Sequence, residues 1–239
     1  LIAYALYCVT PRSKINLSNK LIHQVTELIP HSVHSLIMRM QNFKYIDPTN
    51  TDTVNKGLGH VAKMDKAIFE EFQHDWGTLS FQAEQLTGLS LFDADPLQGA
   101  RPLSSLTQKN QVSRERIFFR KAVLAAHETT CCLSGVTVPA MLVASHIKPY
   151  SKCRTSNERT SPTNGLCLNT FYDKAFDQGI ITIDPYYKVR VSMKVREQYP
   201  QEACERWLYH LEGKTINLPD RFKPDPIFLE YHTDNIFQW

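Results

Sequence analysis

The six cysteines of this 239-residue chain form no Cys-x-x-Cys pair, and their spacing does not resemble a disulfide framework. This absence argues against a zinc clamp and indicates reduced thiols. A long apolar run is also lacking. Residues 1–9 are apolar, but they are too few to span a bilayer and no basic segment stands before them. We therefore expect a cytoplasmic protein without a membrane segment.

Internal repeats and low-complexity tracts are absent too, and 42% hydrophobic with 21% charged residues is typical of a globular protein of one large or two modest domains. The net charge of +3 is small but unevenly distributed. Residues 1–95 hold eight Lys/Arg and ten Asp/Glu (net −2), residues 101–174 eleven and four (net +7), and residues 175–239 eight and ten (net −2). The basic excess in the middle of the chain favours a polyanionic partner.

That basic middle segment contains a pattern with catalytic chemistry. His146 ends an apolar run that predicts a strand, and residues 166–168 predict a second short strand. Thr170 is expected to cap a helix on which Asp173 and Asp177, four residues apart, share one face. A histidine that faces two carboxylates suits metal-assisted hydrolysis, because the imidazole can deprotonate water while a metal stabilises the leaving oxygen.

In the order and spacing of these residues, the stretch resembles the HNH (ββα-metal) nuclease motif of prokaryotic restriction-type endonucleases. The resemblance rests on ASHIKPY at 144–150 and NGLCLNTFYDKAFDQG at 164–179. It extends from about Val112 to the C-terminus. A lone His or Asn would carry no such information, whereas the ordered set is a specific signal.

The resemblance implies a role for each residue of the motif. His146 would be the general base, Asn164 would order the loop, and Asp173 would be a catalytic metal ligand where the family has its last histidine. Ser145 stands where many members have Asp or His as a second ligand, so the ion would rest mainly on Asp173, Asp177 and water. Oxygen ligands imply one Mg²⁺ or Mn²⁺ per site. For Asp177, a backbone contact at the helix end is an equally good explanation.

Basic residues surround the predicted site. They lie in the loop between His146 and Asn164 and along a helix expected at 113–128. A solvated loop is the simpler explanation, but basic side chains beside a hydrolytic site suit a phosphodiester backbone. The residues expected to grip this backbone are Arg116, Arg120, Lys148, Lys152 and Arg154.

The first 95 residues are expected to be mostly helical. Residues 17–29 follow a helical period that ends at Pro30, and Ser32 can cap a second helix. Two such helices across a tight turn resemble a helix-turn-helix, to which residues 47–59 would add a wing. Helix pairs of this kind also occur in folds that never bind DNA. The candidates for contacting bases are His34, Ser35, Arg39, Asn42 and Lys44.

Further elements follow from apolar periods and turn residues. The sequence predicts helices at 61–76, 79–86 and 202–211, a hairpin at 180–191, and a packed aromatic tail at 228–239.

The sequence thus predicts an α+β protein with a helical DNA-recognition domain (1–95), a linker (96–112) and an HNH nuclease domain (113–239). The implied function is metal-dependent, restriction-type cleavage of double-stranded DNA, with a homodimer supplying the second cut. One alternative is a DNA-binding protein with an inactive HNH scaffold, which Ser145 favours. Another is a hydrolase of a small phosphoester, which the clustered basic residues disfavour.

Overall fold

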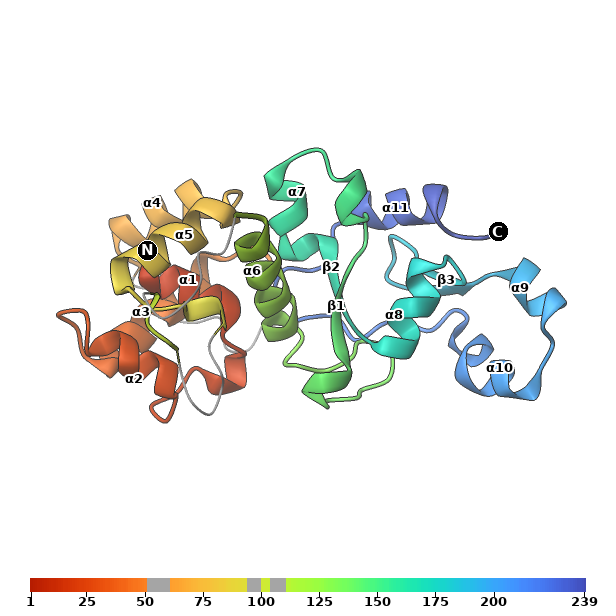
Figure 1. The fold of residues 1–239 in the computed structure, drawn as a ribbon, viewed down its shortest axis with the longest axis horizontal. Coiled ribbons are helices and arrows are strands. Elements are labelled where there is room, and N and C mark those ends of the chain that lie inside the picture. Colours follow the sequence, from red (N-terminus) through yellow and green to blue (C-terminus); the bar gives the residue numbers. More distant parts are fainter. Residues whose placement is uncertain (51–60, 94–99, 104–110) are drawn as a thin grey trace.

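The computed structural model describes residues 1–50, 61–93, 100–103 and 111–239. Two bodies lie along its long axis with helix α6 (Gln111–Ala126) between them (Figure 1). The N-terminal body is helical, and the C-terminal body combines two small antiparallel hairpins with helices. The mixed α+β prediction, with the helical part first, is confirmed at this level.

The N-terminal body is organised around α1 (Ile2–Val9), which is buried over nearly its whole length because its sequence offers no polar face. Ser32 accepts a hydrogen bond from the amide of Ser35, so the predicted cap is confirmed. Helix α2 starts later than predicted, because Asn19 caps it. The helices around α1 are α2 (Lys20–Thr26), α3 (Val33–Ile46), α4 (Lys63–Phe72) and α5 (Trp76–Thr87).

The predicted single helix over 61–76 is wrong. Helix α4 ends at Phe72, and Asp75 caps α5 by accepting a hydrogen bond from the amide of Thr78. Trp76 is therefore the first residue of the next helix, although it continues the apolar period. Helices α2 and α3 form the predicted pair. Because residues 51–59 of the expected wing lie outside the described residues, the winged helix-turn-helix stays a prediction.

Helix α6 belongs to two hydrophobic cores at once. Phe118 and Ala122 pack into the core of the N-terminal body, whereas Phe119 and Val123 pack into the core of the C-terminal body. The two bodies therefore share this helix.

The predicted linker ahead of α6 is fixed in part, since the amide of Ala100 donates a hydrogen bond to Gln24 Oε1 at 2.7 Å.

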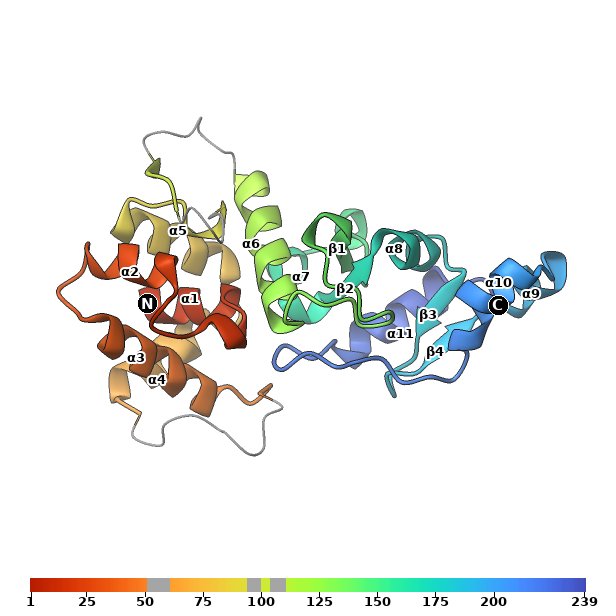
Figure 2. The ribbon, with the colours of Figure 1, turned by 90° about the horizontal axis from the view of Figure 1, so that it is seen from below.

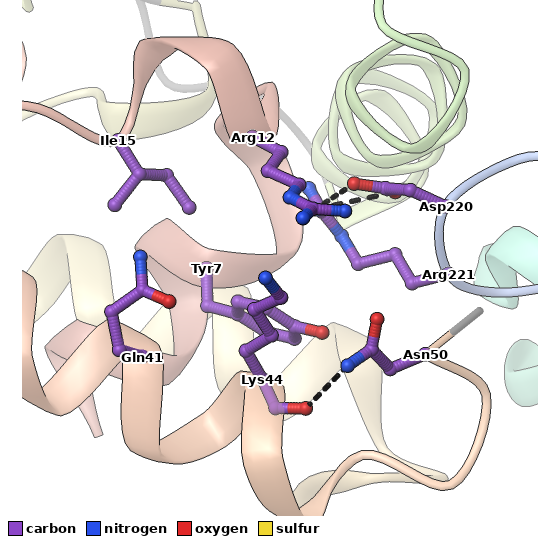
Figure 3. A pocket seen from close by; sticks show the side chains of 8 residues that line it. All are labelled: Tyr7, Arg12, Ile15, Gln41, Lys44, Asn50, Asp220 and Arg221. Carbon is purple, nitrogen blue, oxygen red and sulfur yellow. Dashed lines mark hydrogen bonds and ion pairs between the residues drawn. The ribbon is translucent and has the colours of Figure 1, made fainter. Parts of the chain in front are cut away.

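A second junction is formed by Arg221, which enters the N-terminal body from the C-terminal segment (Figure 3). Its guanidinium donates to the carbonyl of Thr10 at 2.8 Å and lies 4.8 Å from the ring centre of Tyr7. The next ring, Phe222, packs edge-on against Trp76. The adjoining cavity measures about 10 Å³, which suits a single water rather than a phosphate.

The C-terminal body centres on a hairpin of β1 (Leu142–His146) and β2 (Gly165–Asn169), whose register runs from Leu142 opposite Asn169 to His146 opposite Gly165. The predicted hairpin at 180–191 is confirmed. The predicted packed tail at 228–239 is right only in part, because a helix with Leu229 and His232 buried ends at Asn235 and Trp239 is 71% exposed. The predicted helix 202–211 stops at Trp207. The other elements are α7 (Ser156–Thr160), α8 (Thr170–Asp177), β3 (Ile181–Ile183), β4 (Val189–Val191), α9 (Met193–Gln198), α10 (Glu202–Trp207) and α11 (Pro226–Asn235).

Helix α6 approaches the hairpin closely at Gly165. A Cβ atom at this position would clash with Val123 Cγ2 and lie 2.9 Å from the ring of Phe119. We expect Gly165→Ala to lower the free energy of unfolding by about 1–3 kcal/mol, because an added methyl overpacks this contact. Gly77→Ala is the control, since its Cβ would meet nothing closer than 3.7 Å. Equal denaturation midpoints for the two variants would contradict the close approach.

Candidate active site

The hairpin lies between α6 on one side and α8 on the other (Figure 2). Consecutive strand residues point to opposite faces, and the end of β1 follows this rule. Ser145 faces Asp173 on α8, whereas His146 packs on Phe119 of α6. The expectation that His146 directly faces the two carboxylates is therefore wrong. The structure places His146 and the acidic pair on different faces of one strand end.

His146 is held in one ring orientation. Its ring stacks on Phe119 with a centroid distance of 3.7 Å, and its Nε2 lies 2.9 Å from the carbonyl oxygen of Arg159. A carbonyl can only accept, so Nε2 carries the proton and the neutral ring keeps its lone pair on Nδ1. Burial lowers the pKa of His146, the hydrogen bond to Arg159 opposes this, and the charge of Arg116 adds to the lowering. The ring is thus kept neutral, as a proton acceptor requires.

Asn164 is fully buried, and its amide joins both ends of the loop between the strands. Its Oδ1 accepts from the amide of Lys148 at 2.8 Å. Its Nδ2 donates to the carbonyls of Lys148 at 3.1 Å and Glu158 at 2.9 Å. These bonds fix the segment that leads to Arg159, whose carbonyl orients His146. The loop-ordering role predicted for Asn164 agrees with these contacts.

The acidic pair lies on α8, which is capped by Asn169 rather than by Thr170 as predicted. Burial raises the pKa of Asp173, and the Ser145 hydroxyl and Lys174 partly offset this. The pKa of Asp177 is raised by partial burial and by the charge of Asp173. The hydroxyl of Ser145 is buried and makes no hydrogen bond of regular geometry with any residue that the structure describes.

These oxygens suit a divalent cation. Among the described residues, no three His, Cys, Asp or Glu side chains are placed to hold a metal ion together. Mg²⁺, however, usually takes one or two carboxylates and keeps several waters. Asp173, Asp177 and the buried hydroxyl of Ser145 fit that requirement.

The predicted DNA-backbone residues divide into two groups. Lys148 is wrong as a contact to phosphate: its Nζ lies 2.9 Å from Glu158, and only 11% of its side chain is exposed. Arg120 donates to the carbonyl of Leu142, which ties α6 to β1. Lys152 and Arg154 are exposed on the loop, and Arg116 is exposed on α6.

The base-contacting candidates on α3 differ in their exposure. Lys44 is only 5% exposed, so it cannot reach a base in this structure and its assignment is corrected. Arg39 and Asn42 both bind the carboxylate of Asp65 on α4, each at 2.9 Å. His34 is exposed and Ser35 is half-buried.

The sequence predicted no contact with His146 for two residues that touch it, although Arg159 was one of the basic residues of the loop. Tyr150 packs edge-on against His146 with a centroid distance of 5.8 Å, and Arg159 supplies the carbonyl that orients it. The available signal was the aromatic residue at the end of ASHIKPY, enclosed by basic residues.

The segment that forms this site matches a known protein family. The model of the HNH endonuclease family matches residues 131–184, which span the strand, loop, strand and helix described above. Residues 131–184 are therefore similar to an HNH endonuclease domain. The match implies phosphodiester hydrolysis on a nucleic acid. A search of curated proteins found no match. No helix within the described ranges is long and apolar enough to cross a membrane.

The contacts of Asn164 give a test of the HNH loop. Asn164→Ala removes a hydrogen-bond partner from three part-buried backbone groups, and a buried polar group that is left unpaired costs about 1–3 kcal/mol. We expect a clear loss of unfolding free energy and faster hydrogen exchange at the amide of Lys148. Ser151→Ala, an exposed change in the same loop, is the control. Unchanged protection of the Lys148 amide from hydrogen exchange in Asn164→Ala would contradict the role of Asn164 in holding the loop.

Proposed function

We propose that this protein is a divalent-metal-dependent endonuclease of restriction type that hydrolyses phosphodiester bonds in double-stranded DNA. The observation that carries the proposal is the orientation of His146 within the HNH domain. The carbonyl of Arg159 holds the proton on Nε2, so that Nδ1 can accept a proton from a water molecule. The buried His232 also points Nε2 at a carbonyl, but its Nδ1 is bonded to the hydroxyl of Thr182 at 2.8 Å, whereas no described residue bonds Nδ1 of His146.

The remaining residues take roles around this base. Asp173, with Asp177 and Ser145, would hold one Mg²⁺ or Mn²⁺, which when bound supplies charge stabilisation to the phosphate and the leaving oxygen. Asn164 keeps the loop in place through its three bonds. Lys152 and Arg154 are exposed and available to phosphates of the DNA.

The helical N-terminal body is proposed to supply sequence choice. Its net charge of −2 over residues 1–95 gives little non-specific attraction, so its contribution would lie in contacts to bases. His34 is the exposed candidate on α3. One HNH site cuts one strand, and a two-fold homodimer on a palindromic site would supply the second cut.

His146→Ala tests the base. We expect cleavage of supercoiled plasmid with Mg²⁺ to fall by about 100-fold or more, because proton transfer typically contributes 10²–10⁴-fold. DNA binding, measured by fluorescence anisotropy in EDTA, should change little. Near-normal nicking by the variant would overturn the mechanism. A wild-type protein that binds DNA but never nicks it with Mg²⁺ or Mn²⁺ would instead identify the inactive-scaffold alternative.

The two carboxylates should differ in their effect on metal binding. Asp173 lies against Ser145, whereas Asp177 is the more exposed of the two. We expect Asp173→Asn to lose Mn²⁺ binding in calorimetry and Asp177→Asn to weaken it less. Loss of the ion in Asp177→Asn alone would reverse the ranking.

A further inference from the structure

Two guanidinium groups meet at one aromatic ring beside the base. The Cζ of Arg116, on α6, lies 4.7 Å from the ring centre of Tyr150, and the Cζ of Arg159, on α7, lies 5.6 Å from it. The same ring packs edge-on against His146. Three separate elements therefore bring these side chains to one place.

Neither guanidinium is neutralised within the part of the chain that the structure describes. The acidic groups nearby have other partners: Glu158 pairs with Lys148, and Glu115 accepts from Ser156 Oγ at 2.7 Å. Two cations that each lie within 6 Å of the same ring centre repel each other, and the aromatic ring offsets this only in part. Such a pair is suited to an external anion.

We propose that Arg116 and Arg159 together bind one DNA phosphate beside His146 and that Tyr150 is the residue that positions them. This inference rests on the proposed function and specifies how that site takes its substrate. Guanidinium groups present planar forks of donors that match phosphate oxygens. Arg159 has two roles: its carbonyl orients His146, and its side chain binds the phosphate. The clamp thus sets the phosphate relative to Nδ1 of His146.

The ring of Tyr150, rather than its hydroxyl, carries the positioning. The hydroxyl is buried and has no hydrogen-bond partner within the described residues. Tyr150→Phe keeps the ring and should therefore behave as wild type. Tyr150→Leu removes the stacking surface and should resemble loss of both arginines. A melting curve shows whether Tyr150→Leu folds, and the arginine variants test the clamp independently because Arg116 is on the surface.

The test compares Arg116→Gln and Arg159→Gln with Arg206→Gln. Arg206 is an exposed residue of α10 paired with Glu202, so its change removes the same charge away from the hairpin. Binding of a short duplex is measured in EDTA as a function of salt, which needs no cleavage. We expect each clamp variant to reduce the slope of log K against log salt by about one, the signature of one lost phosphate contact. With Mg²⁺, kcat/KM should fall about 10²–10³-fold, as for loss of a charge-stabilising donor.

The outcomes separate the two levels of inference. If wild type binds and cleaves DNA but both clamp variants match Arg206→Gln in salt slope and kcat/KM, the clamp is wrong and the endonuclease remains. If wild type fails to bind duplex DNA, the proposed function itself falls. If Tyr150→Leu folds and keeps the wild-type slope, the positioning role of the ring is overturned.

Discussion

The packing of α6 against the β1–β2 hairpin is the contact on which the rest of the structure depends. Phe119 stacks on His146, and the absence of a side chain at Gly165 lets the helix come this close. One residue earlier, Phe118 packs into the core of the N-terminal body. Two adjacent residues of one helix therefore hold the core of the N-terminal body and the ring of His146 in a fixed relation, because packed interiors yield little.

The loop between the strands is ordered by buried polar groups rather than by apolar packing. Asn164 satisfies backbone groups from both ends of the loop, and the Lys148–Glu158 pair closes it from outside. Buried amides that are fully bonded give a unique arrangement, since each alternative leaves a costly unpaired group. The last segment of this loop carries Arg159, so the order of the loop fixes the tautomer of His146. A change in the loop that moved the Arg159 carbonyl would therefore also change which ring nitrogen of His146 is protonated.

Much of this arrangement could be predicted from the sequence because its signals are local. The strand end at His146, the cap at Ser32 and the hairpin at 180–191 depend on neighbours within a few residues. The errors arose where a side chain has its partner far away in the sequence. The side chain of Lys148 does not reveal from the sequence that its partner is a carboxylate 10 residues away rather than a phosphate. The break at Asp75 was local, but the apolar period continued through it and concealed the cap.

The neutral side chain of Ser145 beside Asp173 affects how the binding of a metal ion and the binding of DNA depend on each other. Ser145 contributes no charge, so the acidic pair attracts a divalent cation less strongly than three carboxylates would. Under the proposed function, a phosphate held by Arg116 and Arg159 would add the missing negative charge and further oxygens. Linkage is reciprocal, so an ion that binds better in the presence of DNA also tightens the binding of DNA by the same factor. Ser145 would then make the affinity for the metal ion depend on bound DNA, and the affinity for DNA depend on the bound ion, without abolishing activity.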